Sequence, residues 1–349
     1  LCDHTSNYKG RYKVLTPLVS QQEQYDTGIR ESDVLIYIGG VSGAEIFPVG
    51  KQMWRVNEDG EFRNQGLPGL KYIFEMSECA FFEHYVKEKN VEFLGEKRID
   101  YYRSVYEDLY SSILPDRLPF SNIWAAYKIA PLVPQNSIVH LGIVNSLRAW
   151  NFFEIPHTVT AYSNVGGYGI DGCMSSLIGA SLVHKDRLYF GVFGDLSFFY
   201  DMNSLGNRHV GNNLRILLVN NGDGTEFRHY CHMGSAFDDE SANKYFAAGG
   251  HYGNKSRVLV KHFAEDLGFE YLSATNKDEF EAVLDKFVQS EISSKSIIFE
   301  IFTDNDSESR SLKMIRNLHT NFKGKLRSAV RQYLPKEVKQ VLKGVLGKE

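Results

Sequence analysis

Two short polar stretches carry the clearest chemical signal in the sequence. The stretch GDLS at residues 194–197 closes one apolar run and an Asn-Asn pair closes the next, so that Asp195 and Asn221 lie 26 positions apart. A carboxylate and an amide oxygen suit a hard cation such as Mg²⁺, which proteins hold through few side chains together with phosphate oxygens. A helix is predicted to begin at Ser197, and the N–H groups at a helix start can receive an anion. These residues therefore predict a site that binds a metal ion and a phosphate group together.

The elements that must position these residues follow from the apolar pattern. Residues 188–193 and 214–219 are short apolar runs typical of buried strands, and residues 198–208 between them are predicted to be helical. A strand–helix–strand unit needs about 30 residues, and its right-handed crossover brings both strand ends to one edge of the sheet. Open α/β sheets bind ligands in the crevice at that edge. The alternative is a helix cap at Asp195 and an unrelated turn at Asn221, but the combined spacing favours the site.

The same alternation extends over residues 119–305, which we interpret as one domain. Its other predicted strands and helices have similar lengths, and they lie at 122–132, 138–141, 158–162, 171–183, 256–267, 277–289 and 297–302. Apolar strands that alternate with helices favour a doubly wound parallel sheet with helices on both faces. The predicted fold class is therefore α/β.

Residues 1–118 differ from this domain and read as part of a second α/β domain. They contain predicted strands at 34–38 and 54–57 and a predicted helix at 80–86. Residues 1–13 show neither a helix start nor the composition of a linker. We therefore expect that preceding sequence has been removed or lies on another polypeptide.

Residues 306–349 are predicted to form a basic, amphipathic helical tail. From Arg310 onward the chain holds 11 Lys or Arg against two Glu, and its apolar residues recur near helical spacing, with a break expected at Pro335. A solvated helix that closes the fold is one interpretation. A helix that docks on a membrane surface or on a partner is the other.

The two polar stretches resemble the signature of thiamine diphosphate (ThDP) enzymes, a Gly-Asp-Gly followed about 25–30 positions later by Asn-Asn. Leu196 replaces the usual second glycine, and this form is similar to that of the 2-succinyl-5-enolpyruvyl-6-hydroxy-3-cyclohexene-1-carboxylate (SEPHCHC) synthases of menaquinone biosynthesis. Residues 162–172 (YSNVGGYGIDG) and 197–205 (SFFYDMNSL) are similar to the same family. The likeness covers about residues 1–305, which would make the chain the middle-domain remainder and the ThDP-binding domain of such an enzyme.

The resemblance implies a role for each matching residue. Mg²⁺ would be bound by the side chains of Asp195 and Asn221 and by the backbone carbonyl of Asp223. Ile170 would hold ThDP in the bent conformation that brings its 4'-imino group against the thiazolium C2–H. The other cofactor contacts would come from Asn145, Ser146, Gly169, Asp171, Gly194, Leu196 and Ser197.

The resemblance also implies an enzyme that decarboxylates a 2-oxo acid and either passes the product to an acceptor or releases it. In this family the site lies between two subunits, so a homodimer or tetramer is expected. The activating glutamate resides on a pyrimidine-binding domain, and no segment of this sequence resembles that domain. We therefore expect the chain alone to be inactive and leave its own catalytic residues unassigned.

Two departures from the family pattern bear on the substrate. Val165 and Trp150 stand where the menaquinone enzymes carry substrate-facing arginines, although Arg148 is close by. Because bidentate arginine contacts favour polyanionic substrates, their loss argues against 2-oxoglutarate and isochorismate. A role in surface-polysaccharide or secondary-metabolite synthesis is a hypothesis.

Two other functions remain alternatives. A non-catalytic ThDP-binding or scaffolding subunit would use the same cofactor residues. A Rossmann-type oxidoreductase would bind NAD(P) through the pattern Gly167-x-Gly169-x-x-Gly172, which follows a predicted strand and precedes a predicted helix.

The histidines carry less specific signals. His229 and His232 form an HxxH pair, which rarely marks a metal site without further ligands. Both are candidates for proton transfer on a loop over the cofactor. His84, His140 and His251 are predicted to be structural or surface residues.

Composition excludes several other classes of function. A net charge of −4 argues against nucleic-acid binding, and no apolar run reaches the ~20 residues that a membrane span needs. The four cysteines form no CxxC pair, which favours reduced thiols in a cytoplasmic protein.

Overall fold

The structure is a computed structural model that describes residues 1–29, 32–38, 52–60, 69–86, 95–165, 169–251 and 255–333. Among these residues the chain forms two compact units, each built on its own parallel sheet. Unit 1 comprises Leu1–Pro17 and Leu114–Lys313. Unit 2 comprises the described residues between 18 and 113 and those from 314 onward. The predicted α/β fold class is confirmed.

Unit 1 contains a six-stranded sheet in the order β5-β4-β6-β7-β9-β8, in which all neighbours are parallel. The strands are β4 (Ile138–Leu141), β5 (Thr160–Tyr162), β6 (Tyr189–Gly194), β7 (Leu214–Asn220), β8 (Glu270–Ala274) and β9 (Ile297–Phe302). The chain leaves β4 toward β5 on one side and then continues in β6 on the other. The strand order therefore reverses between β4 and β6, and such a switch point opens a crevice at the carboxyl ends of the strands.

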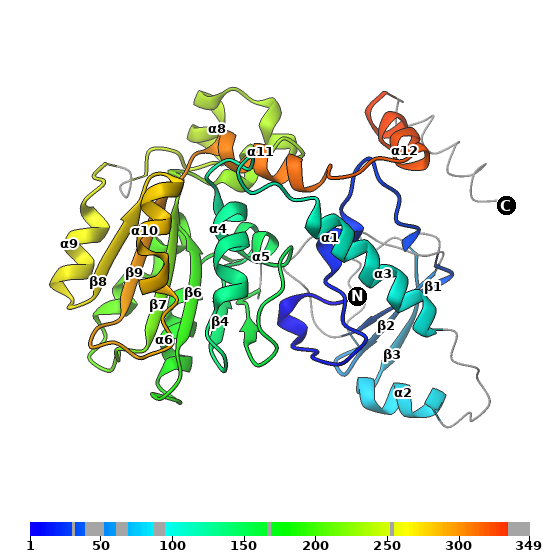
Figure 1. Cartoon of the computed structure of the whole chain (residues 1–349), viewed down its shortest axis with the longest axis horizontal. Helices are drawn as coiled ribbons and strands as arrows, with labels where there is room; N and C mark the ends of the chain where they lie inside the picture. The colour runs from blue at the N-terminus through cyan, green and yellow to red at the C-terminus, as the bar shows by residue number, and fades with distance from the viewer. Residues whose placement is uncertain are drawn as a thin grey trace. The chain divides into compact units, whose positions relative to one another are not determined.

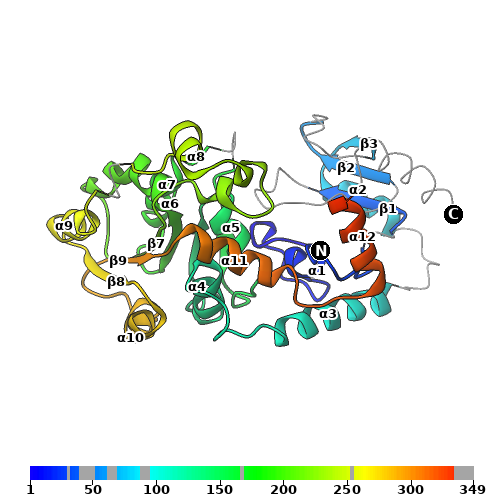
Figure 2. The same cartoon turned by 90° about the horizontal axis from the view of Figure 1, so that it is seen from above.

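Helices cover both faces of this sheet, as Figures 1 and 2 show. In Figure 2, α6 and α7 lie on one side of the strands, and α4 and α10 lie on the other. The helices of unit 1 around the sheet are α4 (Asn122–Ile129), α5 (Asn145–Trp150), α6 (Cys173–Ser181), α7 (Asp195–Asp201), α9 (Leu259–Asp266) and α10 (Lys277–Phe287). Alternate side chains of β6 reach opposite faces. Phe193 joins a buried cluster with Leu177 of α6, whereas Phe190 packs edge-on against Phe287 of α10 at 5.7 Å between ring centroids.

Several boundaries differ from those that the sequence predicted. The helix after β6 begins at Asp195 rather than Ser197, and a short 3-10 helix, η5 (Met202–Gly206), completes the stretch predicted as one helix. α6 begins at Cys173 because Gly172 before it adopts a left-handed φ of 73°. Between β7 and α9 the chain forms η6 (Thr225–Arg228), η7 (Met233–Ala236) and α8 (Asp239–Tyr245), none of which the apolar pattern predicted.

Unit 2 contains a three-stranded parallel sheet in the order β1-β2-β3. The predicted elements are present as β1 (Val34–Ile38), β2 (Gln52–Asn57) and α2 (Glu78–Val86), and the structure adds β3 (Leu70–Glu75) and α3 (Gly95–Ser111). The short helix α1 (Thr16–Ser20) spans the boundary between the two units. None of the helices in the described part of the chain combines the length and hydropathy of a membrane span. None of the four cysteines forms a disulfide.

The region predicted as a basic tail is divided between the two units. Most of α11 (Asn305–Ile315) belongs to unit 1, whereas α12 (Phe322–Tyr333) belongs to unit 2. Glu308 and Ser311 of α11 are buried. Residues 334–349, with the predicted break at Pro335, lie outside the described residues.

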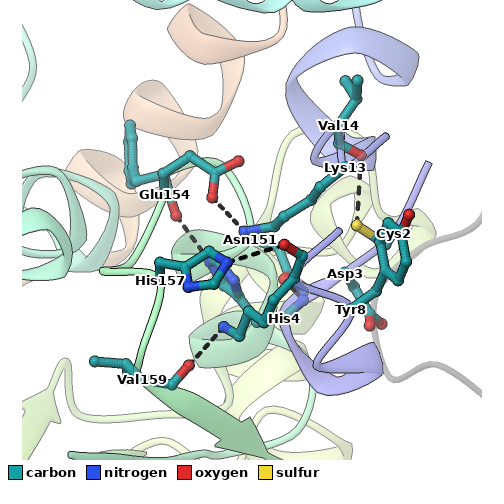
Figure 3. Close-up of polar contacts among 12 residues, drawn as sticks. Cys2, Asp3, His4, Tyr8, Lys13, Val14, Asn151, Glu154, His157 and Val159 are labelled. Atoms are coloured by element: carbon teal, nitrogen blue, oxygen red, sulfur yellow. Dashed lines mark hydrogen bonds and ion pairs between the residues drawn. The ribbon is translucent and has the colours of Figure 1, made fainter. Parts of the chain in front are cut away.

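The first residues of the chain are bound to unit 1 rather than to the rest of the region predicted as residues 1–118. The backbone N–H of His4 donates to Asn151 Oδ1 (2.8 Å), and Lys9 Nζ donates to Val159 O (2.5 Å). Figure 3 labels His4, Asn151 and Val159, together with Lys13 and Glu154. His4 Nε2 lies near two backbone carbonyls, and burial lowers the pKa of His4 to about 4, so the ring is neutral. Lys13 forms an ion pair with Glu154. The first residues of the chain therefore bind the residues that connect α5 to β5.

A buried carboxyl joins α11 to the start of α4. Glu308 Oε1 accepts from the backbone N–H of Asn122 (2.8 Å) and from Thr303 Oγ1 (2.8 Å), and Ser311 Oγ accepts from Ser121 Oγ (2.9 Å). Burial raises the pKa of Glu308 to about 7 despite these hydrogen bonds. Its ionised form is therefore less favourable in the folded protein than in the unfolded chain.

Glu308→Gln is predicted to remove a pH dependence of stability. Because the folded pKa is raised, the contribution of Glu308 is fully present below the unfolded pKa and is lost as the pH rises through about 7. The variant should gain up to about 3 kcal/mol relative to wild type between pH 5 and pH 8. Thermal unfolding at both pH values measures this, with Glu265→Gln on the exposed face of α9 as control. An equal pH dependence in wild type and Glu308→Gln would contradict the assignment.

Candidate active site

Asp195 lies directly after β6, where the sequence pattern placed it, and is 2% exposed. Three N–H groups donate to its carboxylate. Leu196 N donates to Oδ1 (2.9 Å), while Gly222 N (2.8 Å) and His251 Nε2 (2.9 Å) donate to Oδ2. A buried carboxylate needs such partners, because an uncompensated charge away from water is strongly unfavourable. A carboxylate has about four lone-pair sites, so Oδ1 retains one for a cation.

Gly222 joins the two halves of the predicted signature. β6 and β7 are neighbours in register, with Gly194 opposite Val219, so both strands end at the same edge. Asn221 follows β7, and Gly222 adopts a φ of 91°, which favours glycine and turns its N–H toward Asp195. The structure therefore brings the Asp195 carboxylate and the Asn-Asn turn together, as the strand–helix–strand spacing predicted.

The two asparagines of this turn differ in their contacts. Asn220 is buried, and its Nδ2 donates to Glu300 Oε1 (2.7 Å), whose second oxygen accepts from Tyr271 Oη (2.7 Å). Burial raises the pKa of Glu300. Asn220 thus serves the interior between β7, β9 and β8, whereas Asn221 Oδ1 accepts from Asp223 N (3.4 Å).

Asp223 has a buried side chain that is used within the protein. Its Oδ2 accepts from Asn305 Nδ2 (2.6 Å) and its Oδ1 from Thr225 Oγ1 (3.2 Å), and burial raises its pKa. Its backbone carbonyl accepts from Thr225 N (3.0 Å), and a carbonyl oxygen has a second lone pair. A role for Asp223 in metal binding would therefore use the carbonyl and not the carboxylate, as the resemblance implied.

A cation at this point would have few protein ligands. In the described part of the chain, no group of three or more His, Cys, Asp or Glu side chains could hold a metal ion. The residues at hand are one carboxylate (Asp195), one amide (Asn221) and one carbonyl (Asp223). That set fits Mg²⁺ completed by phosphate oxygens and water, and it does not fit a metal that needs a full cage of side chains.

The residues expected around the cofactor lie on the neighbouring segments. Ser197 Oγ donates to the carbonyl of Ile170 (2.6 Å), which links the segment after β5 to the first turn of α7. Leu196 N donates to Asp195, so this N–H and the Ser197 hydroxyl, both expected at the diphosphate, have partners within the protein. Asp171 is exposed, and its carbonyl accepts from Asn164 Nδ2 (3.3 Å).

The glycines of these segments are placed as follows. Gly169 is partly buried just before Ile170. Gly194 has open space where a Cβ would stand and begins α7 as its N-cap. Gly167 of the GxGxxG alternative lies outside the described residues. A dinucleotide site also needs an acidic residue after the next strand, and Asp195 is the candidate. The carboxylate of Asp195 instead accepts from Gly222 N, directly after the Asn-Asn pair.

Asn145 and Ser146 follow β4, across the switch point from β6. Val144 before them has φ 68° and ψ −103°, a conformation that is strained for a β-branched residue. Gly142 N donates to Val192 O (2.8 Å), which holds this turn against β6. Strained backbone of this kind persists where the surrounding structure enforces it, here at the edge of the crevice.

Arg148, Glu226 and His229 form a buried network around Asn145. Arg148 makes two hydrogen bonds to Glu226, from Nη1 to Oε2 (2.6 Å) and from Nη2 to Oε1 (3.0 Å). Asn145 Oδ1 accepts from Arg148 Nη1 (3.0 Å) and lies 2.9 Å from His229 Nε2. Arginine has no acceptor, so Asn145 presents its oxygen here, and His229 must carry its proton on Nε2.

Of the two histidines proposed for proton transfer, the structure places His229 at this network. His232 instead accepts from Gly234 N through Nδ1 (2.9 Å) and packs against Phe227, which makes it a cap of η7. His251, predicted to be structural or superficial, is bound to Asp195. No local pattern could have identified it, because it lies 56 positions after Asp195 and in no recognisable motif.

Comparison with known proteins places the chain beside one group of enzymes. It is 32% identical over 263 residues to the 2-succinyl-5-enolpyruvyl-6-hydroxy-3-cyclohexene-1-carboxylate synthase of Bacteroides fragilis, and 31% and 30% identical over 264 residues to those of Phocaeicola vulgatus and Bacteroides thetaiotaomicron. Each match covers 75% of this chain and 44% of the relative. The chain thus spans less than half the length of these curated relatives. No family model matches it.

Val144→Gly is predicted to be tolerated far better than other valine-to-glycine changes. Relief of about 1–2 kcal/mol of backbone strain should offset the lost side chain and the added chain entropy, so stability should stay within about 1 kcal/mol of wild type. Val139→Gly, at a fully buried position of β4, should cost at least about 3 kcal/mol. Urea unfolding measures both. Similar losses in the two variants would show that Val144 carries no strain.

Proposed function

We propose, from the kinship of this chain with the SEPHCHC synthases, that it forms the diphosphate- and Mg²⁺-binding part of a ThDP-dependent enzyme. The observation that carries the proposal is the hydrogen bond from Gly222 N to Asp195 Oδ2 (2.8 Å). It joins the acid after β6 and the amide after β7 at one edge of the sheet, beside the point where the strand order reverses. Ligands of open α/β sheets bind at this edge.

The cation would be held by Asp195 Oδ1, the Asn221 side-chain oxygen and the Asp223 carbonyl. The buried environment and the remaining lone pair of Asp195 support its part. Phosphate oxygens and water would complete the octahedron that Mg²⁺ requires. Because the diphosphate is itself a ligand in this arrangement, Mg²⁺ and cofactor should bind together.

The cofactor would lie across the segments after β4, β5 and β6. Ile170, tied to α7 through Ser197, would support the bend of the cofactor between Asn145 on one side and Asp195 on the other. ThDP, when bound, supplies the electron sink for loss of CO₂ from a 2-oxo acid. The protein contributes the metal clamp, the orientation and a site from which water is excluded. His229, with its proton on Nε2 beside Asn145, is the side chain of this network suited to proton transfer.

Turnover would require the pyrimidine-binding domain and its activating glutamate, from the same protein or from a partner chain in a homo-oligomer. The segment between β7 and α9 exposes apolar side chains beside the site, among them Met233 (87% exposed), Tyr245 (72%) and Phe237 (56%). Large exposed apolar surfaces are typical of interaction sites. We expect the pyrimidine-binding domain to dock there.

The substrate should be less anionic than those of the menaquinone enzymes. Arg148 lies two residues before Trp150, but Glu226 neutralises it through two hydrogen bonds, and it is buried. Trp150 is completely buried and Val165 is apolar, so neither replaces a carboxylate clamp. A monocarboxylic 2-oxo acid fits these surroundings better than a dicarboxylic one.

Asp195→Asn is predicted to abolish the Mg²⁺ dependence of ThDP binding. The amide keeps the shape of the side chain but lacks the charge that a divalent cation needs, so affinity for ThDP with Mg²⁺ should fall at least about tenfold. Calorimetry with ThDP, in the presence of Mg²⁺ or of a chelator, measures this, with Asp285→Asn on the exposed face of α10 as control. Undiminished binding in Asp195→Asn, or tight binding of NAD in place of ThDP, would refute the assignment.

A further inference from the structure

His251 contacts the one carboxylate of the candidate site. Its Nε2 lies 2.9 Å from Asp195 Oδ2, and a carboxylate can only accept, so the imidazole donates. The side chain of His251 is 14% exposed, and that of Asp195 is 2% exposed. The contact is therefore largely shielded from water. A hydrogen bond to a charged group is stronger in such a place than in water.

A closed segment and a turn of left-handed residues precede His251 in the chain. The segment that begins after β7 closes on itself where Gly224 N donates to Ala247 O (2.5 Å). Two left-handed residues then follow, Ala248 at φ 53° and Gly250 at φ 73°. An alanine in this conformation is strained by about 1 kcal/mol or more, so the surrounding structure must enforce the turn.

The ring of His251 is also fixed from its other side. It packs against Phe199 of α7, with 5.5 Å between the ring centroids and 52° between the planes. Phe199 belongs to the same helix as Asp195. Helix α7 therefore supplies both the carboxylate that His251 binds and the surface against which its ring rests.

The pattern of donors determines how the carboxylate is oriented. Gly222 N and His251 Nε2 together occupy Oδ2, whereas Oδ1 accepts from Leu196 N and keeps one lone pair. Without His251, Oδ2 would have a vacant acceptor site of its own, and the carboxylate could rotate. With His251 in place, a single acceptor direction at Oδ1 is left for a cation.

We infer that His251 is a positioning residue of the cation site, which holds the Asp195 carboxylate so that Oδ1 faces the metal. The inference rests on the proposed function. It also couples the site to the segment between β7 and α9, because His251 lies on that segment. Residues that hydrogen-bond to metal ligands typically contribute about 10–100-fold to metal affinity, which sets the size of the expected effect.

The test uses calorimetry to measure ThDP binding to the full chain at increasing Mg²⁺ concentrations. It compares wild type with His251→Ala, His251→Gln and His262→Ala. Glutamine carries an N–H donor four bonds from its Cα, as the histidine Nε2 is, but has no ring and no charge. His262 is an exposed histidine of α9 and serves as the control. Hydrogen exchange of the Leu196 and Gly222 amides is measured in parallel without cofactor.

In His251→Ala, the Mg²⁺ concentration for half-maximal binding should rise about 10–100-fold, and saturating Mg²⁺ should restore ThDP binding. His251→Gln should recover most of this loss, and His262→Ala should match wild type. The Leu196 and Gly222 amides should exchange faster in His251→Ala, because their acceptor is no longer fixed.

Two results would overturn this inference and leave the proposed function standing. One is an unchanged Mg²⁺ requirement in His251→Ala while wild type binds ThDP. The other is a loss that neither Mg²⁺ nor His251→Gln restores, accompanied by a lower melting temperature, which would make His251 a residue of the fold. If wild type itself takes up no ThDP with Mg²⁺, the proposed function fails and this inference fails with it.

Discussion

The buried carboxylate of Asp195 is the constraint on which the rest of the site depends. A carboxylate that is 2% exposed is tolerated only with hydrogen-bond donors around it. Three segments supply these donors: Leu196 in the first turn of α7, Gly222 in the turn after β7, and His251 between β7 and α9. The same hydrogen bonds that stabilise the charge also set the direction of its remaining lone pair. The orientation of this carboxylate therefore depends on contacts from all three segments.

Two segments of unit 1 contain strained backbone as well as hydrogen bonds that hold it. Val144 and Ala248 both adopt positive φ values; Val144 directly precedes Asn145, and Ala248 lies three residues before His251. Such conformations are costly unless the fold enforces them. Backbone hydrogen bonds hold both places: Gly142 N donates to Val192 O near Val144, and Gly224 N donates to Ala247 O next to Ala248.

Arg148, Glu226 and His229 form a second network, around Asn145. Arg148 makes two hydrogen bonds to Glu226 and also donates to Asn145 Oδ1, which orients this amide and, through it, the proton on His229.

The sequence alone determined the α/β class, the strands β4, β6, β7 and β9, and the pairing of Asp195 with the Asn-Asn turn. These depend on local apolar runs and on a crossover of nearly fixed length, both of which can be read from spacing. It could not determine that Asn220 turns inward while Asn221 does not, that a valine would adopt φ 68°, or that the first 17 residues pack on unit 1. Nor could it identify His251, whose partner is 56 positions away. Those features arise from contacts between segments far apart in the chain, where no residue pattern records which donor will meet which acceptor, and only the folded structure decides them.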